Sequence, residues 1–446
     1  MNRKCILTLL IGLLSLNLWV PRAGAELRYE VISCGTFGRN ASYPSGLNNL
    51  GEVACYSYGT PHLFFWDGSL HNIDIPNRLF AIAYDLNDLS EIVGCYYYAN
   101  RQNHGFIWRD GSLTDLGVPP AGKDCYATAI NNQSEVTGYA DNHAFRWKDG
   151  VLSMLEGLDS NHDSRGRDIN DKGQILGVIR GTFPFSYRTF IWKNGTARYL
   201  EPLPGCYLCI GNRINNMGDV IGIAFNSRDD GPSGERIVLW KDGVPTDLGI
   251  SCGNTMDYNY DINDLGEIVG RIRFNYRSLI SIPMLYRNET WMNLNDMILP
   301  GSGWTVIAPI RINNHSQIAA TGVDQQRNYH ALLLNPIYIT KIDIRPNEEP
   351  NVINLKSKGK VAVAVFASED FRIKDLDYST VMLAGASSIA HELDDVDGDG
   401  TQEMVFRFKT TDLQLLPETT SLTLTGTTFN GTKVQGSDSV RIVGAK

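Results

Sequence analysis

The residues best suited to chemistry form one acidic loop near the C-terminus, made of Asp395, Asp397, Asp399, Thr401 and Glu403. Alternate carboxylates, a backbone carbonyl and a closing glutamate are the oxygen ligands that wrap a hard cation. Gly400 permits the sharp turn, although Phe406 stands where a full EF-hand loop has its bidentate glutamate. The spacing therefore predicts a structural calcium (Ca²⁺) site, with a solvated acidic turn as the alternative.

Cysteine spacing offers a second kind of chemistry. Cys206 and Cys209 have the CxxC spacing of redox and zinc sites, but a second CxxC and nearby histidines are missing. We therefore expect disulfide bonds, either one loop bridge or two longer-range bridges. Without Cys5 the number is odd, so at least one cysteine is unpaired within the chain. The candidates are Cys34, Cys55, Cys95, Cys125, Cys206, Cys209 and Cys252.

Catalytic motifs are missing from the sequence. It contains neither a nucleophile elbow nor a zinc-protease helix, so no catalytic residue is assigned. Four histidines recur at one position of a sequence repeat, which predicts a shared structural hydrogen bond instead of a metal or catalytic role. They are His62, His104, His143 and His330.

The elements that must position these residues come from that repeat. A phrase of the form Ile-Asn-x-x-Gly-x-(Ile/Val)-x-Gly, here called the Asn-turn, occurs seven times with steps of 39, 44, 39, 45, 48 and 50 residues. This period lies in the range of propeller blades. Its asparagines are Asn48, Asn87, Asn131, Asn170, Asn215, Asn263 and Asn313.

Each repeat divides into four short β-type segments, in the second repeat 81–86, 91–97, 104–108 and 113–116. Four local antiparallel strands make a propeller blade. The sequence therefore predicts an all-β chain with a seven-bladed β-propeller, six or eight blades being the alternatives. The segment 29–33 is expected to complete the last blade, because the seventh repeat lacks a fourth strand.

The repeats resemble the bacterial extracellular repeats called the HAF family, named for a His-Ala-Phe triplet that stands here at 143–145. The resemblance covers roughly residues 26 to 335, because the Asn-turn and a Trp-containing turn recur in order. It implies an exported repeat protein and no particular reaction. The eroded last two repeats and the cysteines depart from the family pattern.

Loop lengths indicate where a ligand would bind. The turns between strands one and two and between three and four are uniform, whereas the other connections vary and leave from the opposite face, here called the variable face. Binding sites are commonly placed on such loops, and tyrosine and arginine suit sugar and peptide contacts. The candidates are Tyr56, Tyr58, Tyr97, Arg101, Tyr187, Arg188, Arg228, Tyr258, Tyr276 and Trp304.

The N-terminus predicts an exported chain. A basic start, an apolar run at 5–20 and small residues at 23–25 form a signal peptide, with cleavage after Ala25. The alternative is a membrane anchor, but the run is short and contains Asn17. Removing three of the 40 basic residues leaves 37 against 49 acidic ones, which argues against nucleic acid and anionic membranes as partners. We expect a secreted or periplasmic protein without membrane insertion.

After the propeller at 26–336, alternating segments such as KVAVAVFAS and EMVFRFKT predict a small antiparallel β-sandwich at 337–446. This region resembles a C-terminal accessory domain of many secreted bacterial proteins, through IDIRPNEEPNVINLKSKGKVAVAVF, LDDVDGDGTQE and GSDSVRIV. The resemblance implies an accessory module without known catalysis. Its acidic loop resembles the short calcium loops of integrin-like repeats.

These observations predict a non-catalytic binding or adhesion-type protein that recognises an extracellular glycan or protein through the variable face. One alternative is a secreted polysaccharide hydrolase or lyase with its site at the propeller channel, using acids such as Asp229, Asp230 or Glu235. A second alternative is a purely structural extracellular scaffold.

Overall fold

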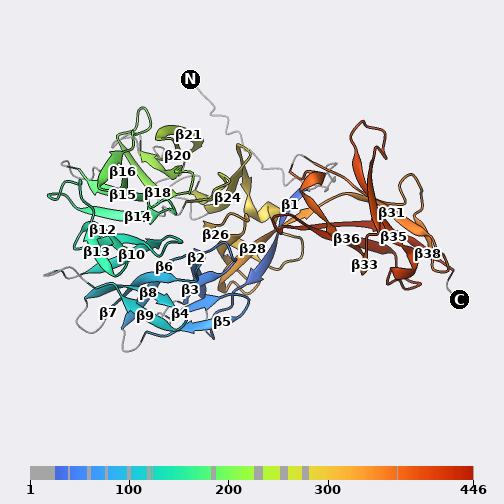
Figure 1. Ribbon diagram of the computed structural model, residues 1–446, viewed down its shortest axis with the longest axis horizontal. Coiled ribbons are helices and arrows are strands. Elements are labelled where there is room, and N and C mark those ends of the chain that lie inside the picture. The colour runs from blue at the N-terminus through green and yellow to red at the C-terminus, as the bar shows by residue number, and fades with distance from the viewer. Residues whose placement is uncertain are drawn as a thin grey trace, which may run out of the picture. The chain divides into compact units, whose positions relative to one another are not determined.

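The computed structural model describes residues 26–38, 41–57, 62–75, 79–97, 102–117, 122, 124–181, 187–225, 235–251, 260–273, 281–368 and 370–444. It divides into two compact units, one of Arg28–Ile337 and one built mainly from Tyr338–Lys446. Both units consist mainly of antiparallel β-sheet, so the predicted all-β propeller fold is confirmed (Figure 1). No helix within the described ranges is long and apolar enough to span a membrane.

The first three blades are four-stranded antiparallel sheets whose strands pair in chain order. They comprise β2 (Ser42–Leu47), β3 (Val53–Ser57), β4 (His62–Trp66) and β5 (Leu70–Ile73); β6 (Phe80–Leu86), β7 (Ile92–Tyr97), β8 (Asn103–Arg109) and β9 (Ser112–Asp115); and β10 (Cys125–Ile130), β11 (Val136–Ala140), β12 (His143–Lys148) and β13 (Val151–Met154).

The next three blades repeat this order. They comprise β14 (Ser164–Ile169), β15 (Ile175–Arg180), β16 (Tyr187–Lys193) and β17 (Thr196–Tyr199); β18 (Leu208–Ile214), β19 (Val220–Phe225), β20 (Glu235–Lys241) and β21 (Val244–Ser251); and β22 (Asp261–Ile262), β23 (Ile268–Arg273), β24 (Ser281–Arg287) and β25 (Thr290–Asn293), after which comes the one-turn helix α1 (Leu294–Met297).

The last blade joins the two ends of the first unit. Its strands β26 (Thr305–Ile312), β27 (Ile318–Val323) and β28 (Tyr329–Ile339) take their fourth neighbour from the N-terminus, where β1 (Glu26–Ser33) pairs with β28. The backbone N–H of Cys34 continues this contact by donating to the carbonyl of Ala331 at 2.9 Å. The segment expected to complete the last blade therefore lies beside it.

The Asn-turn between the first two strands of each blade explains why the repeat keeps asparagine. In the third blade, Asn131 Oδ1 accepts the backbone N–H groups of Gln133 and Glu135 at 3.0 and 2.9 Å. Its Nδ2 donates to the carbonyl of Asn170 in the next blade at 3.0 Å. One buried side chain thus closes its own turn and ties two blades together, using its donor and its acceptor.

The same inter-blade bond closes into a ring. Each Asn-turn asparagine donates to the carbonyl of the next one at 2.8–3.0 Å, and Asn313 donates back to Asn48. A second ring lies one residue later, where Asn and Asp alternate until Asn314 meets Asn49. Here each backbone N–H donates to the side-chain oxygen of the next blade. The turn ends of the blades are therefore hydrogen-bonded to one another all round the channel.

The last glycine of the repeat phrase allows a close backbone approach. The innermost strand of most blades carries a β-bulge, for example between Ala127 and Ala129 of β10. Opposite this bulge, a Cβ on Gly138 would stand 1.8 Å from the carbonyl oxygen of Tyr126. In the second blade a Cβ on Gly94 would stand 2.0 Å from that of Ile82. Only glycine fits there, so the phrase encodes the bulge as well as the turn.

The second unit packs two sheets over one core. One sheet contains β37 (Lys433–Ser439), β36 (Ser421–Thr428), β32 (Leu376–Leu383) and β33 (Ala386–Ser387), and the other contains β29 (Ile342–Ile344), β31 (Lys360–Val365), β35 (Glu403–Lys409) and β34 (Ala390–Asp394). The short strands β30 (Val352–Asn354) and β38 (Arg441–Val443) pair in parallel, and η2 (Ile373–Asp375) and η3 (Thr410–Asp412) are single 3₁₀ turns. The alternating residues Val361, Val363, Phe406 and Phe408 fill the core.

The cysteines differ from expectation. The six described cysteines, Cys34 to Cys209, are all free thiols, and Cys252 lies outside the described residues. Five of the six are buried, for example Cys55 in the core of the first blade, where burial is the main cause of its raised pKa. The predicted disulfide bonds are thus not formed among these six residues, which act as small core side chains.

A shared structural hydrogen bond is predicted for all four repeated histidines, and three of them contact neighbouring chain segments. His104 Nδ1 contacts the Asp115 carboxylate at 2.9 Å, and His330 Nδ1 contacts the Ser33 hydroxyl at 3.3 Å. His143 Nε2 contacts the carbonyl of Ser160 at 3.1 Å. These bonds link strands or blades, so they require neither a metal nor a catalytic role.

Candidate functional site

A cavity of about 360 Å³ lies in the propeller channel, and residues from every blade line it. Most of them come from the innermost strands, on the variable-face side of the Asn-turn ring. The volume falls in the range of small-molecule sites, roughly 300–1,000 Å³. The lining contains four arginines and no carboxylate among the described residues: Arg165, Arg167, Arg213 and Arg311. A cavity with this lining suits an anionic ligand.

Seven of the lining residues share one place in the repeat, three residues before the Asn-turn asparagine. The β-bulge lies at this position in β2, β6, β10, β14 and β18, so it directs a non-repeated side chain into the channel. The residues are Ser45, Tyr84, Thr128, Arg167, Asn212, Tyr260 and Ile310. The repeat thus determines where this side chain lies, while its residue type differs from blade to blade.

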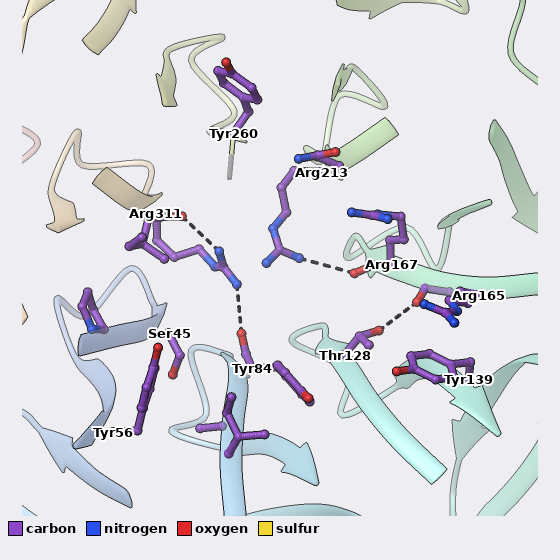
Figure 2. Close-up of a pocket in the computed structure, with 16 residues that line it drawn as sticks. Ser45, Tyr56, Tyr84, Thr128, Tyr139, Arg165, Arg167, Arg213, Tyr260 and Arg311 are labelled. Atoms are coloured by element: carbon purple, nitrogen blue, oxygen red, sulfur yellow. Dashed lines mark hydrogen bonds between the residues drawn. The ribbon is translucent and has the colours of Figure 1, made fainter. Parts of the chain in front are cut away.

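Two arginines dominate the middle of the cavity. Arg213 from β18 and Arg311 from β26 extend their guanidinium groups toward the centre of the ring (Figure 2). Their side chains are only 16% and 12% exposed. Arg311 Nη2 donates to the carbonyl of Tyr84 at 2.9 Å, and Arg213 Nη1 donates to that of Arg167 at 3.4 Å. Backbone carbonyls from other blades therefore hold the two heads in place.

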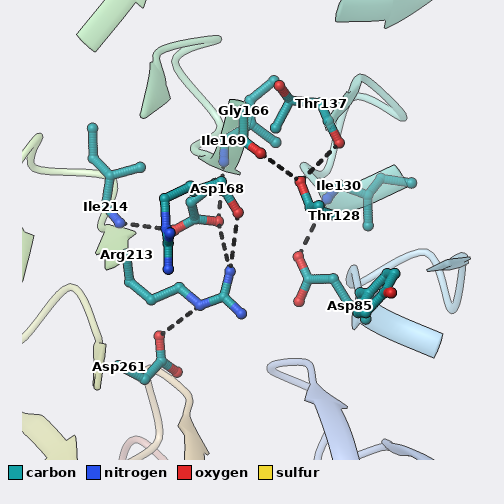
Figure 3. Close-up of polar contacts among 12 residues, drawn as sticks. Asp85, Thr128, Ile130, Thr137, Gly166, Asp168, Ile169, Arg213, Ile214 and Asp261 are labelled. Carbon is teal, nitrogen blue, oxygen red and sulfur yellow. Dashed lines mark hydrogen bonds and ion pairs between the residues drawn. The ribbon is translucent and has the colours of Figure 1, made fainter. Parts of the chain in front are cut away.

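Three aspartates, of which Asp168 and Asp261 are buried, stand next to these arginines. Figure 3 shows Asp168 and Asp261 beside Arg213. Arg213 Nη1 lies 3.6 Å from Asp168 Oδ1, and Arg213 Nε lies 3.8 Å from Asp261 Oδ1. Asp85 Oδ1 lies 3.8 Å from Arg311 Nε. All three occupy the position two residues before the Asn-turn asparagine, as do both arginines.

The aspartates also bond to the backbone, because each accepts an N–H group from the following blade. The donors are Ile130 to Asp85 at 3.2 Å, Ile214 to Asp168 at 2.7 Å and Ile312 to Asp261 at 2.8 Å. Their carboxylates are thus turned to the blade junctions, whereas the guanidinium heads face the cavity.

Burial perturbs the protonation of this group. It raises the pKa of Asp168 to about 7, against the opposing effect of the Arg213 charge. Burial also raises the pKa of Asp261. For Arg311, burial and then the nearby charge of Arg213 lower the pKa. Titratable groups with such shifts cluster at functional sites, and Asp168 changes its charge near neutral pH.

Tyrosines form part of the cavity wall. Tyr139 stacks on Tyr126 with ring centroids 4.6 Å apart, and the Arg165 guanidinium lies 4.8 Å from the centre of the Tyr139 ring. Burial raises the pKa of Tyr139 and that of Tyr84, so both stay protonated at neutral pH. Neutral aromatic faces with hydroxyl tips suit sugar rings.

One lining residue carries an unsatisfied polar atom. Asn212 is 5% exposed, and its Oδ1 has no hydrogen-bond partner in the described part of the chain. Buried polar atoms without a partner cost roughly 1–3 kcal/mol each, so they are rare unless a ligand or water completes them. Asn212 lies at the bulge of β18, directly before Arg213.

The structure brings one of the ten residues predicted on the variable face, Tyr56, into this cavity. Tyr97 stacks on Phe80, Arg188 lies over the Tyr199 ring at 3.9 Å, and Trp304 packs edge-on against His330. The remaining described residue, Tyr187, is 39% exposed at the start of β16. Tyr58, Arg101, Arg228, Tyr258 and Tyr276 lie outside the described residues, as do Asp229 and Asp230. Glu235 begins β20.

The second unit contains a separate group of ligand atoms. Asp395, Asp397 and Glu403 each offer a carboxylate oxygen, and these oxygens lie within 4.8 Å of one another. Burial raises the pKa of Glu403, and the carboxylates of Asp397, Asp399 and Asp395 add to this effect. A cation would remove that repulsion, so the group could hold a metal ion. Thr401 donates its backbone N–H to Asp399 at 2.7 Å, which shapes the same loop.

No family model and no curated protein matches the chain. Solved structures do resemble it. An oligogalacturonate lyase from Vibrio parahaemolyticus has a TM-score of 0.48 and 10% identity over 70% of this chain and 97% of its own. The β-propeller domain of the Trilobed protease from Pyrococcus furiosus has a TM-score of 0.43 and 10% identity over 66% and 95% of the two chains. A puromycin-hydrolysing peptidase from Mycobacterium tuberculosis has a TM-score of 0.45 and 10% identity over 74% and 60%.

These likenesses, at about 10% identity, show the fold alone. The prediction of a non-catalytic binding or adhesion-type protein that acts through the variable face is corrected, because the candidate groups converge in the channel. The three proteins compared are themselves enzymes or a domain of one. The physical reason for that error is visible in the cavity. From the sequence we expect the site on the variable loops, whereas the charged and aromatic groups converge inside the channel.

Proposed function

We propose that the chain is an enzyme that cleaves polysaccharide in the propeller channel, as a hydrolase or a lyase. The observation that carries this proposal is the channel cavity itself, where four arginines and several tyrosines converge beside buried aspartates with raised pKa values. A well-formed pocket with convergent polar groups and perturbed titratable residues is the best candidate for an active site.

Tyrosines and arginines would contact a bound sugar chain in different ways. Tyr56, Tyr84, Tyr139 and Tyr260 line the cavity with aromatic rings. Asp168 lies behind Arg213 and is a positioning residue, because its carboxylate contacts the guanidinium and two backbone N–H groups. Its protonation near neutral pH changes how strongly Arg213 is held.

The test is a cleavage assay with the purified chain and a panel of acidic and neutral polysaccharides. New reducing ends report both hydrolysis and elimination, whereas ultraviolet absorbance of an unsaturated product reports elimination alone. We expect new ends with at least one acidic polymer, and a large loss of rate in Arg311→Gln. The matched control is Arg236→Gln, an arginine of the fifth blade that pairs with Asp247 at 3.0 Å away from the cavity lining.

Two results would contradict the proposal. One is the absence of new ends with every polymer while the chain is folded. The other is an activity that Arg311→Gln leaves intact and that therefore arises elsewhere.

We also propose that the cation of the acidic loop is Ca²⁺, held by Asp395, Asp397, Asp399, Thr401 and Glu403. Support comes from the all-oxygen donor set and from the carboxylate repulsion at Glu403. Ca²⁺ at a hundredfold excess over its dissociation constant would stabilise the second unit by about 2.7 kcal/mol. Chelation should lower the unfolding temperature of that unit and spare the propeller.

The control for the calcium site is Asp412→Asn, an exposed aspartate outside the loop in the same unit. Asp397→Asn should remove the response to Ca²⁺, whereas Asp412→Asn should keep it. An unchanged melt of the intact chain on chelation would contradict the calcium assignment.

We propose further that the chain is exported as a HAF-type repeat protein and meets its glycan outside the cell. The signal-like leader and the recurrence of the Asn-turn support this. Expression with the leader followed by fractionation tests it, and a chain that stays cytoplasmic with residues 1–25 intact would contradict it.

A further inference from the structure

The charges of the channel suggest which polysaccharide fits. Five charged side chains, each at most 16% exposed, stand two residues before the Asn-turn asparagine: Asp85, Asp168, Arg213, Asp261 and Arg311. Only the arginines among them line the cavity. Arg165 and Arg167 add two further cationic groups to the wall. A ligand in the cavity therefore meets guanidinium groups on several sides and no carboxylate from the described lining.

Arg213 and Arg311 make only long ion pairs with the neighbouring aspartates. Their ion pairs are long, at 3.6–3.8 Å, because the aspartate oxygens also accept backbone N–H groups at 2.7–3.2 Å. Arg311 Nε makes no hydrogen bond within the described chain. An ionised guanidinium with an unused donor in a low-dielectric cavity favours an anionic partner that accepts hydrogen bonds.

Asn212 supplies an independent sign of a ligand. Its Oδ1 is buried and unpartnered, and it lies on the cavity wall beside Arg213. An amide oxygen accepts a hydrogen bond, so its partner must be a donor such as a sugar hydroxyl. The site therefore fits a ligand that carries an anionic group and a hydroxyl group close together. A sugar ring that carries a carboxylate has both.

We propose that the channel binds a uronate residue of an acidic polysaccharide, with its carboxylate on Arg213 and Arg311 and one ring hydroxyl on Asn212. This inference rests on the proposed cleavage function and narrows its substrate class. Tyr139 and Tyr56 on the wall provide faces for the sugar rings. A carboxylate is planar and accepts paired bonds from a guanidinium fork, which a neutral sugar cannot do.

The test is calorimetric titration of the full chain with short uronate oligomers, sulfated galactan oligomers and glucose oligomers of equal length. We expect uronate oligomers to bind at least tenfold more tightly than the other two. Arg213→Gln and Arg311→Gln should each weaken uronate binding at least tenfold. Arg213→Lys keeps the charge but loses the planar fork, so it should weaken binding to an intermediate degree.

Further variants separate the parts of the site. Asn212→Ala removes the orphaned acceptor and should weaken uronate binding several-fold, and Arg236→Gln should leave it unchanged. Thermal melts of each variant establish that it is folded, and Arg213→Lys keeps the test decisive if a glutamine variant fails to fold.

The outcomes distinguish this inference from the proposed function. Tight uronate binding that depends on both arginines, without any cleavage, supports the inference and contradicts the enzyme. Cleavage that Arg311→Gln abolishes, by a chain that binds uronate oligomers no more tightly than glucose oligomers, does the reverse. Preference for the sulfated oligomers overturns the carboxylate assignment, and equal affinity for glucose oligomers overturns the anion site.

Discussion

The two ends of the propeller channel use the same repeat in opposite ways. At the turn end, Asn side chains of successive blades satisfy one another in a ring that closes from Asn313 to Asn48. Three residues earlier in each repeat, at the cavity, the side chains differ from blade to blade, and Asn212 keeps an unpaired oxygen. Repeated positions therefore stabilise the fold, whereas positions that the repeat leaves open carry the candidate chemistry. Substitutions at the two kinds of position should separate stability from ligand binding.

The largest expected effect lies at a repeated glycine. Gly138→Ala places a methyl group 1.8 Å from the carbonyl oxygen of Tyr126, so the bulge of the third blade must move. We expect the free energy of unfolding to fall by ~3 kcal/mol or more, measured by urea denaturation. Gly359→Ala is the control, because its nearest neighbour is the flexible Ser357 hydroxyl at 3.1 Å. Equal losses in both variants would contradict a role for the close approach.

A smaller loss is expected when one asparagine leaves the ring. Asn131→Ala removes three hydrogen bonds and leaves the buried N–H of Glu135 and the buried carbonyl of Asn170 without this partner. The expected loss is about 2 kcal/mol in the free energy of unfolding. Asn161→Ala, in an exposed turn, should cost less than ~0.5 kcal/mol. If Asn131→Ala lowers the free energy of unfolding no more than Asn161→Ala does, the asparagine ring does not stabilise the turn end of the channel.

At the cavity end, the main effect should be a change in how binding depends on pH. Asp168 faces Arg213, Asp85 and Asp261, and its pKa is raised to about 7. As the pH rises through this value, Asp168 gains a negative charge that competes with an incoming carboxylate for Arg213. Uronate affinity should therefore fall roughly five- to tenfold with rising pH. In Asp168→Asn this fall should disappear, whereas Asp163→Asn, an exposed aspartate before β14, should retain it.

The smallest effect on stability is expected for an exposed arginine of the wall. Arg165→Gln removes a charge that lies 4.8 Å from the Tyr139 ring centre. Its free energy of unfolding should change by less than ~0.5 kcal/mol, because the side chain packs at the surface. Uronate affinity should still fall two- to threefold in calorimetric titration. A large loss of stability without any change in uronate affinity would contradict the assignment of Arg165 to the ligand-binding end of the channel.

The fold was predictable because its signal is local and repeated. Asn-x-x-Gly and the following glycine determine a turn and a bulge within ten residues, so seven copies reveal the blades. The cavity gave no such signal, since Ser45, Tyr84 and Arg167 share a position but no chemistry. One clue was present in the sequence: Asp168, Arg213 and Asp261 stand in innermost strands, where a charge needs a partner.

The predicted ligand-binding residues illustrate the same limit. The candidates are aromatic and arginine residues from connections of variable length, and Tyr56 reaches the cavity because it lies on the second strand of its blade. Tyr97 and Trp304 instead pack against neighbouring rings. The acidic loop was easier to find, because its ligands are contiguous and Asp395, Asp397 and Glu403 do bring their oxygens together.

The most direct measurement is a crystal structure of the full chain soaked with a short uronate oligomer. We expect a sugar carboxylate within hydrogen-bonding distance of the Arg213 and Arg311 guanidinium groups, and a ring hydroxyl on Asn212 Oδ1. An oligomer bound on the outer loops with the channel free of sugar would contradict this expectation.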